Sequence, residues 1–143
     1  MKIYLASPFF NAEEISIYHK VIQDLRAAGH EVYVPQEHTI ENAWDLFNKD
    51  WANRVYINDI EAIDDCECMM ILNFGMYSDS GTAWEAGYAF AIGKWTIQVL
   101  CGGDNATYSL MMMNGCDRVV ELRNVVHFNE DGANANMNKV IQK

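Results

Sequence analysis

The stretch that decides the fold spans residues 66–100 and reads CECMMILNFGMYSDSGTAWEAGYAFAIGKWTIQVL. Its first part, residues 66–73, is a nearly continuous apolar run of strand length, typical of a central strand in a parallel sheet that is covered on both faces. A helix is predicted over residues 80–94, and Trp95–Leu100 is the next strand. A strand, a helix and a second strand in this order form a βαβ unit, which predicts a parallel sheet.

The chain before this stretch shows the same alternation. Lys2–Ala6 is a short strand that ends at Ser7-Pro8, because proline cannot donate to a strand ladder. Residues 12–28 have the apolar spacing of a helix with Asn11 as a possible cap, and residues 31–34 are a second strand. These elements form another βαβ opening.

A longer helix is predicted over residues 44–63. Its apolar residues fall on one side: Trp44, Phe47, Trp51, Val55 and Ile60. Residues 108–114 are a short helix or a loop, the last strand is either Arg118–Glu121 or residues 124–128, and residues 135–141 are a final short helix. The alternation predicts one α/β domain over residues 1–143, a doubly wound (flavodoxin- or Rossmann-like) five-stranded parallel sheet with helices on both faces.

The composition limits the possible partners. The chain has 143 residues and a formal net charge of -10, and half of its residues are hydrophobic. Because an acidic surface repels phosphate backbones, we expect no nucleic-acid partner. No apolar run approaches the roughly 18 residues that span a bilayer, so we expect no membrane partner either. Residues 1–6 lack the charged and long apolar regions of a signal peptide.

Motif spacing limits the chemistry. The four cysteines fit no CxxC or zinc pattern, and the histidines show no metal spacing, so we expect a reduced, cytoplasmic protein without a metal. The sequence contains no GxGxxG, P-loop or GxSxG motif, and we expect no cofactor.

The predicted helix over residues 80–94 contains a single acid, Glu85, among small and large apolar residues. A carboxylate on such a surface is costly to bury unless it is paired. The start of this helix lies at the carboxyl edge of the sheet, where α/β folds bind ligands, and a helix N-terminus favours the ionised carboxylate. Two interpretations stay open: a nucleophile in a dry pocket, or a structural acid bonded to a loop hydroxyl.

Five further side chains are candidates for the same edge. Asp79 is either a plain helix cap or a ligand acceptor. Asp59, near the end of the long helix, is interpreted as a solvated acid when taken alone. Tyr4 packs in the core, where its hydroxyl could point towards the helix glutamate. Phe9 and Phe10 are either tucked into the core edge or form a stacking wall for a flat ligand such as a nucleobase.

Three segments together resemble the nucleoside 2-deoxyribosyltransferases: Ile-Tyr-Leu-Ala, Asn-Asp-Ile and Asp-Ser-Gly-Thr-Ala-Trp-Glu-Ala-Gly-Tyr-Ala. The resemblance extends over most of the chain to about residue 100. The functional residues of the family occur here in the same order and spacing: Tyr4, Asp59, Asp79 and Glu85. The strongest part of the resemblance begins at Gly81, which we place with the substrate-binding residues.

The resemblance implies a mechanism. Glu85 would attack C1′ of a 2′-deoxynucleoside from the face opposite the base, and a second base would then displace it with net retention. Asp59 would protonate the leaving base, a task that needs a raised pKa. Tyr4 would hold Glu85 in position, and Asp79 would accept a hydrogen bond from the sugar 5′-hydroxyl.

The resemblance also implies a class of substrate. Related deoxynucleoside 5′-monophosphate N-glycosidases have a serine at the position of Asp79 and an arginine after the first strand. Here that position is an acid and the loop has no arginine, so a phosphate would be repelled and free nucleosides are expected. Phe9 and Phe10 match the aromatic loop that lines the base site, and Gln36 or His38 is a candidate for reading the base.

Members of the family assemble as oligomers whose sites are shared between subunits, which implies a homo-oligomer here, a dimer or a hexamer. The residue that a neighbouring subunit supplies to the 5′-hydroxyl site aligns with Ser109, with Asn114 further along. The methionine-rich segment 111–113 suits an interface. Two other readings stay open: a hydrolase that uses water as the acceptor, and a non-catalytic nucleoside-binding module.

Overall fold

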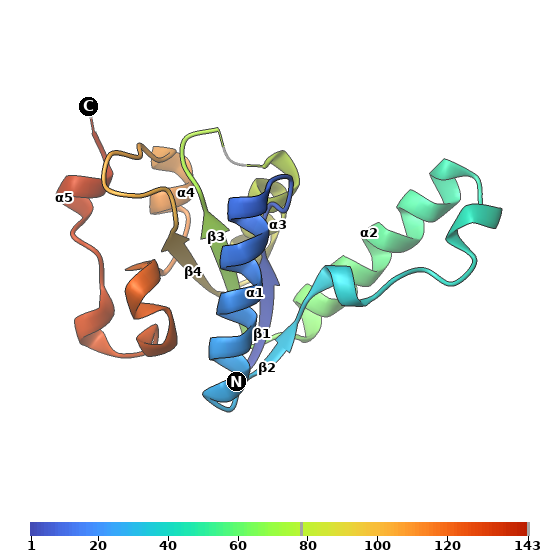
Figure 1. Ribbon diagram of the computed structural model, residues 1–143, viewed down its shortest axis with the longest axis horizontal. Helices are drawn as coiled ribbons and strands as arrows, with labels where there is room; N and C mark the ends of the chain where they lie inside the picture. The colour runs from blue at the N-terminus through green and yellow to red at the C-terminus, as the bar shows by residue number, and fades with distance from the viewer. Residues whose placement is uncertain (78, 143) are drawn as a thin grey trace.

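The computed structural model describes residues 1–77 and 79–142, so Ser78, in the predicted loop before the glutamate helix, and the terminal Lys143 lie outside the described residues. The sheet has five parallel strands, in the spatial order β2-β1-β3-β4-β5 (Figure 1). Their bounds are β1 Lys2–Ala6, β2 Glu31–Tyr33, β3 Cys68–Asn73, β4 Trp95–Leu100 and β5 Arg118–Glu121. The predicted parallel α/β sheet is therefore confirmed, in its flavodoxin-like order.

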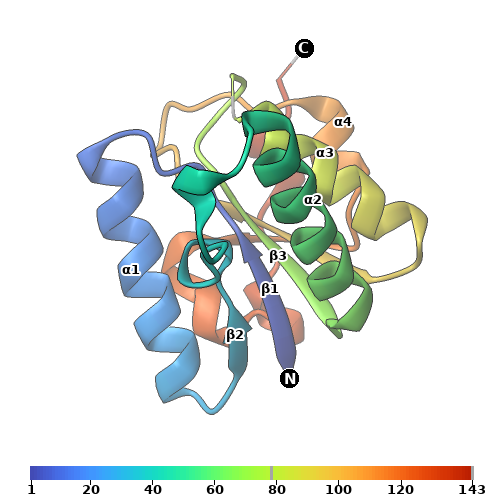
Figure 2. The ribbon, with the colours of Figure 1, turned by 90° about the vertical axis from the view of Figure 1, so that its right-hand side faces the viewer.

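Helices cover both faces of this sheet. The α-helices are α1 Ala12–Ala27, α2 Asn48–Asp65, α3 Ser80–Ala91, α4 Leu110–Asn114 and α5 Met137–Val140. Short 3-10 turns occur at η1 Pro35–Glu37, η2 Ala43–Asp45, η3 Leu122–His127 and η4 Asp131–Ala133. Figure 2 shows α1 on one side of the sheet and α2 and α3 on the other. Among residues 1–77 and 79–142, no helix is long and apolar enough to cross a membrane.

The alternation of each strand divides the core between the two faces. Ile3 and Leu5 of β1 point to the α1 face, where they pack with Tyr18 and Leu25. Tyr4 and Ala6 point to the opposite face, where their cluster includes Ala86 and Ala89 of α3 together with Ile63 of α2. Two small side chains of α3, Ala86 and Ala89, therefore face the sheet, whereas Gly81, Gly87 and Ala91 are exposed.

The structure also corrects the predicted bounds of α2. Trp44 and Phe47 were expected on its apolar side, but both precede the helix, and their side chains are 101% and 83% exposed. Asn42 has a left-handed backbone with φ 55°, which separates the η2 turn from the preceding loop. The segment before α2 and the first turns of α2 project from the body of the molecule as an arm (Figure 1).

Two smaller expectations are also settled. Of the two candidates for the last strand, Arg118–Glu121 is β5, whereas residues 124–128 fall mostly in the η3 turn. Asn11 caps α1, because its Oδ1 accepts the backbone N–H of Glu14 at 2.9 Å. Gly29 follows that helix at φ 91°, a backbone conformation that favours glycine.

Candidate active site

A cavity of about 980 Å³ opens at the carboxyl end of β1, beside the first turns of α3. This position matches the switch point of the sheet between β1 and β3, where ligands bind in such folds. Four acids line it: Asp45 of the η2 turn, Asp59 of α2, Asp79 before α3 and Glu85 of α3. Apolar and amide side chains also line it, among them Phe9, Gln36, Ile40, Asn42, Trp44, Asn48, Trp51, Val55 and Asn58.

Glu85 is the most perturbed of these acids. Burial raises its pKa to about 7, the hydrogen bond from Tyr4 opposes this rise, and the charges of Asp59 and Asp79 add to it. The helix N-terminus was expected to favour the ionised form, but burial outweighs it and the pKa lies above its usual range. A strongly raised pKa on an acid that lines a cavity is typical of a functional site.

Tyr4 holds the glutamate from inside the sheet. Its side chain is fully buried, and its hydroxyl donates a hydrogen bond to Oε2 of Glu85. Burial and the neighbouring carboxylates raise the pKa of Tyr4, so it stays a neutral phenol and a donor. Its ring stacks on Tyr33, the cross-strand neighbour in β2, at a centroid distance of 5.3 Å and an angle of 16°.

Behind Tyr33 the stack continues to the cavity wall. The imidazole of His38 lies 4.1 Å from the Tyr33 ring at an interplanar angle of 7°. His38 lines the cavity together with Asp59, so a column of rings connects the wall near Asp59 to the residue that holds Glu85. Tyr33 had no role in the sequence analysis, although its pairing with Tyr4 follows from the register of β1 and β2.

Asp59 is half-buried on α2 and faces the same cavity. Burial raises the pKa of its carboxyl group above its ordinary value of 3.8, and the charge of His38 partly opposes the rise. A raised pKa is what a general acid requires. The structure therefore places this helix acid at the cavity, where sequence reasoning taken alone favoured a solvated position.

Asp79 is both a helix cap and a wall of the cavity. Its Oδ2 accepts the backbone N–H of Thr82 at 2.8 Å and the hydroxyl of Thr82 at 2.9 Å. Gly81 does not line the cavity, but a Cβ there would lie 3.2 Å from Oδ2 of Asp79. Such a contact would be tighter than most real Cβ atoms make. Glycine at position 81 therefore leaves room for the capping carboxylate.

Of the predicted site residues Phe9, Phe10, Ser109 and Asn114, only Phe9 lines the cavity. Phe9 lines the cavity, whereas Phe10 is 75% exposed and borders a second hollow of about 310 Å³ that also touches Asp79. Their rings stack at 5.8 Å. Ser109 precedes α4 and Asn114 ends it, and neither lines the cavity of its own chain.

Metal ligands are not gathered at this centre. In the part of the chain that the structure describes, no three His, Cys, Asp or Glu side chains are grouped so that they could hold a metal ion. The cavity lining that the structure describes also contains no lysine or arginine. The arrangement is therefore two carboxyl groups with raised pKa values, those of Asp59 and Glu85, at a partly apolar cavity that Asp79 and Asp45 also line.

Comparisons with known proteins agree with this geometry. A family profile described as nucleoside 2-deoxyribosyltransferase matches residues 3–121. A solved 2-deoxyribosyltransferase from Bacillus psychrosaccharolyticus is 30% identical, with a TM-score of 0.79 over 99% of this chain and 98% of that chain. No match to a curated protein reached significance.

Two more distant structures share the fold. A conserved protein from Enterococcus faecalis is 20% identical, with a TM-score of 0.74 over 90% of this chain and 96% of that chain. The CMP N-glycosidase of Clostridium botulinum is 22% identical, with a TM-score of 0.54 over 85% of this chain and 87% of that chain. Because the family profile covers most of the chain, and a deoxyribosyltransferase aligns over nearly all of it, the chain belongs to the nucleoside 2-deoxyribosyltransferase family of pentosyl-transferring enzymes.

Proposed function

We propose that this enzyme transfers 2-deoxyribose between the nucleobases of free 2′-deoxynucleosides, through a covalent deoxyribosyl ester on Glu85. The observation that supports the proposal most strongly is the partly buried Glu85 carboxyl, held by the Tyr4 hydroxyl and lining one cavity with Asp59. A protein that only binds nucleosides needs no carboxylate with a pKa raised to about 7 beneath the sugar.

In the first half-reaction, the ionised Glu85 attacks C1′ while the bond from C1′ to the base nitrogen breaks. The electron pair of that bond leaves with the base, and the proton of Asp59 neutralises it. The transition state has oxocarbenium character, which the nearby carboxylate stabilises. Free base and the deoxyribosyl ester of Glu85 are the products.

In the second half-reaction, a nitrogen of another base attacks C1′ and the ester bond breaks. The proton of the incoming base passes to Asp59, so both acids return to their starting forms and the configuration at C1′ is retained. Tyr4 donates to the leaving carboxylate throughout, because its own pKa stays high. The exchange would serve nucleoside salvage.

Free nucleosides suit this site better than nucleotides. Asp79 borders the cavity at the helix start, and a 5′-phosphate beside its carboxylate would be repelled. The described lining offers no lysine or arginine to neutralise that phosphate. Asp79 is instead suited to accept a hydrogen bond from a 5′-hydroxyl.

The test is a base exchange. Thymidine and free adenine are incubated with the protein, and deoxyadenosine and thymine are separated by chromatography. We expect both products in equal amounts. Thymine without deoxyadenosine would show a hydrolase, and neither product would favour a binding module. Faster turnover of thymidine monophosphate than of thymidine would contradict the assignment of Asp79.

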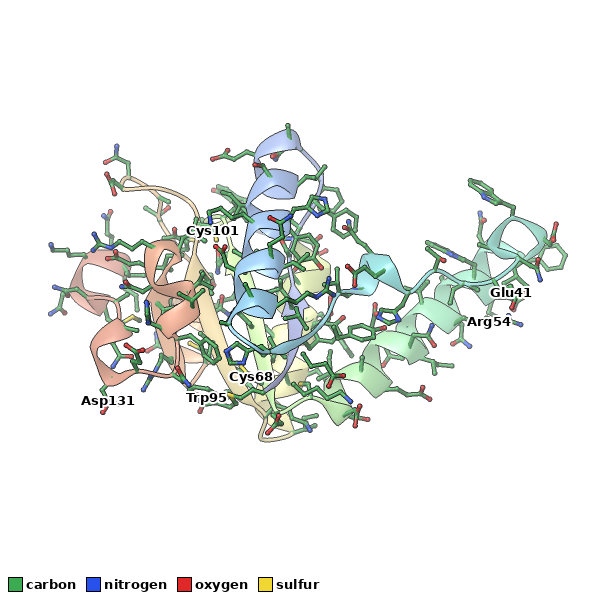
Figure 3. All side chains as sticks on the ribbon, turned by 60° about the horizontal axis from the view of Figure 1, so that its bottom comes forward. Glu41, Arg54, Cys68, Trp95, Cys101 and Asp131 are labelled. Atoms are coloured by element: carbon green, nitrogen blue, oxygen red, sulfur yellow. The ribbon has the colours of Figure 1, made fainter. Side chains whose placement is uncertain are left out.

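We also propose a homo-oligomer, a dimer or hexamer, in which neighbouring subunits complete each site. The support is the apolar arm: Trp44, which lines the cavity, and Phe47, which does not, are almost fully exposed, an uncommon position for large apolar side chains. Figure 3 shows Glu41 and Arg54 on the same arm, far from the sheet. All four cysteines are free thiols, which fits a cytoplasmic enzyme.

Sedimentation velocity tests the oligomer. The wild-type protein should sediment as a dimer or larger species, and Trp44→Ser should shift it towards the monomer. Ile15→Ser, at a half-exposed site on α1, is the matched control and should leave the distribution unchanged. A wild-type protein that is monomeric at all concentrations would contradict the proposal.

A further inference from the structure

Thr82, in the first turn of α3, contacts the capping residue Asp79 through two donors. Its side chain is 2% exposed and borders the cavity. The hydroxyl donates to Oδ2 of Asp79 at 2.9 Å, and the backbone N–H of the same threonine donates to the same oxygen at 2.8 Å. Two donors from one residue therefore bind one oxygen of the capping carboxylate.

The start of α1 shows that a cap does not require the second donor. There Asn11 accepts only the backbone N–H of Glu14 among the described contacts, at 2.9 Å, and α1 is longer than α3. One backbone donor per cap is the ordinary arrangement. The hydroxyl of Thr82 thus adds something beyond helix capping, namely a second point of attachment that fixes the rotation of the Asp79 carboxylate.

The fixed rotation leaves the other oxygen available. Within residues 1–77 and 79–142, Oδ1 of Asp79 accepts no hydrogen bond, while Oδ2 accepts both. Gly81 supports this orientation, because a Cβ would lie 3.2 Å from Oδ2 and push the carboxylate away. An acceptor whose direction is set before the ligand binds loses less conformational freedom on binding.

We propose that Thr82 is a positioning residue that orients Asp79 towards the 5′-hydroxyl of the sugar, and thereby makes the site specific for nucleosides with a free 5′-hydroxyl. The inference rests on the proposed function, in which Asp79 accepts that hydroxyl. Thr82 does not touch the reacting atoms. It acts by keeping one carboxylate oxygen occupied so that the other faces the sugar.

The test compares thymidine with 5′-deoxythymidine, which lacks only the 5′-hydroxyl. Thr82→Val removes the hydroxyl at nearly constant volume and keeps the backbone cap, and Thr82→Ser keeps the hydroxyl. We expect Thr82→Val to lower kcat/KM for thymidine about tenfold, the effect of losing a well-oriented hydrogen bond to a charged group. The same variant should change kcat/KM for 5′-deoxythymidine less than about twofold, and Thr82→Ser should restore the preference.

A merely structural role would lower kcat/KM for both nucleosides equally, and that result would overturn the proposal. An unchanged preference of Thr82→Val for thymidine over 5′-deoxythymidine would overturn it as well. Thermal unfolding of each variant checks the fold, and Thr82→Ala provides a smaller side chain if valine does not fit.

Dissociation constants of both nucleosides, measured by quenching of tryptophan fluorescence, separate this inference from the proposed function. Binding without turnover in the wild-type protein would refute the transferase proposal. The ratio of the two dissociation constants in Thr82→Val would still decide the role of Thr82.

Discussion

The two faces of the sheet are built differently, and the difference separates stability from chemistry. On one face, α1 buries five of its sixteen residues: Glu14, Tyr18, Val21, Ile22 and Leu25. On the other face, α2 buries only Ile63 among eighteen residues. The well-covered face resembles an ordinary core. The cavity touches this face only at its edge, through Tyr18, whereas its three candidate functional acids come from the segments on the other side of the sheet.

This division has a physical reason. A carboxyl group near apolar surface is destabilising unless it is paired or hydrogen-bonded, and the second face holds Asp59 and Glu85, both with raised pKa values. Other parts of the domain must offset this destabilisation. The burial of apolar side chains beneath α1 contributes to that stability. Substitutions of the site acids should therefore change mainly kcat, and substitutions beneath α1 should change mainly the free energy of unfolding.

The largest effect is expected for Glu85→Gln. The amide keeps the shape of the side chain but cannot form the ester, so kcat for base exchange should fall by about four orders of magnitude or more. The free energy of unfolding should not decrease, because a partly buried charge is removed. Exchange assays and denaturant titration at pH 8 measure the two quantities. Glu13→Gln, in the first turn of α1, is the control and should retain wild-type exchange. Turnover of Glu85→Gln within tenfold of wild type would reject this residue as the nucleophile.

The opposite pattern is expected for Leu25→Ala on the α1 face. Leu25 is fully buried, and truncation of a buried leucine to alanine removes about 2–5 kcal/mol from the free energy of unfolding. The kcat of the folded protein should stay within twofold, because Leu25 does not line the cavity.

Ile15→Ala is the control for Leu25→Ala on the same helix, since its side chain is 40% exposed and its loss should change the free energy of unfolding by less than about 0.5 kcal/mol. A loss of activity without a loss of stability in Leu25→Ala would contradict the separation of the two faces.

The same contrast explains which features could be predicted from sequence. Strands β1 and β4 have the predicted bounds, because a mainly apolar strand ends where a proline or a cluster of turn residues begins, although β4 also buries the polar side chains of Thr96 and Gln98. The acids of the site were also predictable, since Asp59, Asp79 and Glu85 lie in segments that resemble one family. The carboxyl edge of a parallel sheet explains why Asp79 and Glu85 meet the cavity, whereas Asp59, in the second half of α2, reaches it because α2 packs beside α3.

The features that sequence reasoning missed depend on the surroundings of a side chain in the folded protein. The apolar stripe through Trp44, Phe47 and Trp51 predicted a buried helix face, but periodicity does not say whether the core, a ligand or another subunit covers it. Similarly, the position of Glu85 near a helix start predicted an ionised acid, because the depth of its burial was not visible. The contact of Thr82 with Asp79 depends on a side-chain rotamer, which no pattern of residue types specifies.

The smallest effect, and the sharpest test of the catalytic face, is expected for Tyr4→Phe. The Tyr4 hydroxyl lowers the pKa of Glu85, so its loss should raise that pKa above about 7. Since the nucleophile must be ionised, the acidic limb of the kcat/KM profile should move to higher pH by up to about one unit. At pH 9, where Glu85 is ionised in both proteins, kcat should fall tenfold or less.

Exchange rates between pH 5 and pH 9 measure this shift. Tyr88→Phe is the matched control, because its hydroxyl also donates to a carboxylate, that of Asp64, but lies outside the cavity, so the limb should stay in place. A shift to lower pH in Tyr4→Phe would mean that the phenol stabilises the protonated glutamate, and would reverse the role assigned to this residue. An unchanged limb would mean that another group sets the ionisation of the nucleophile.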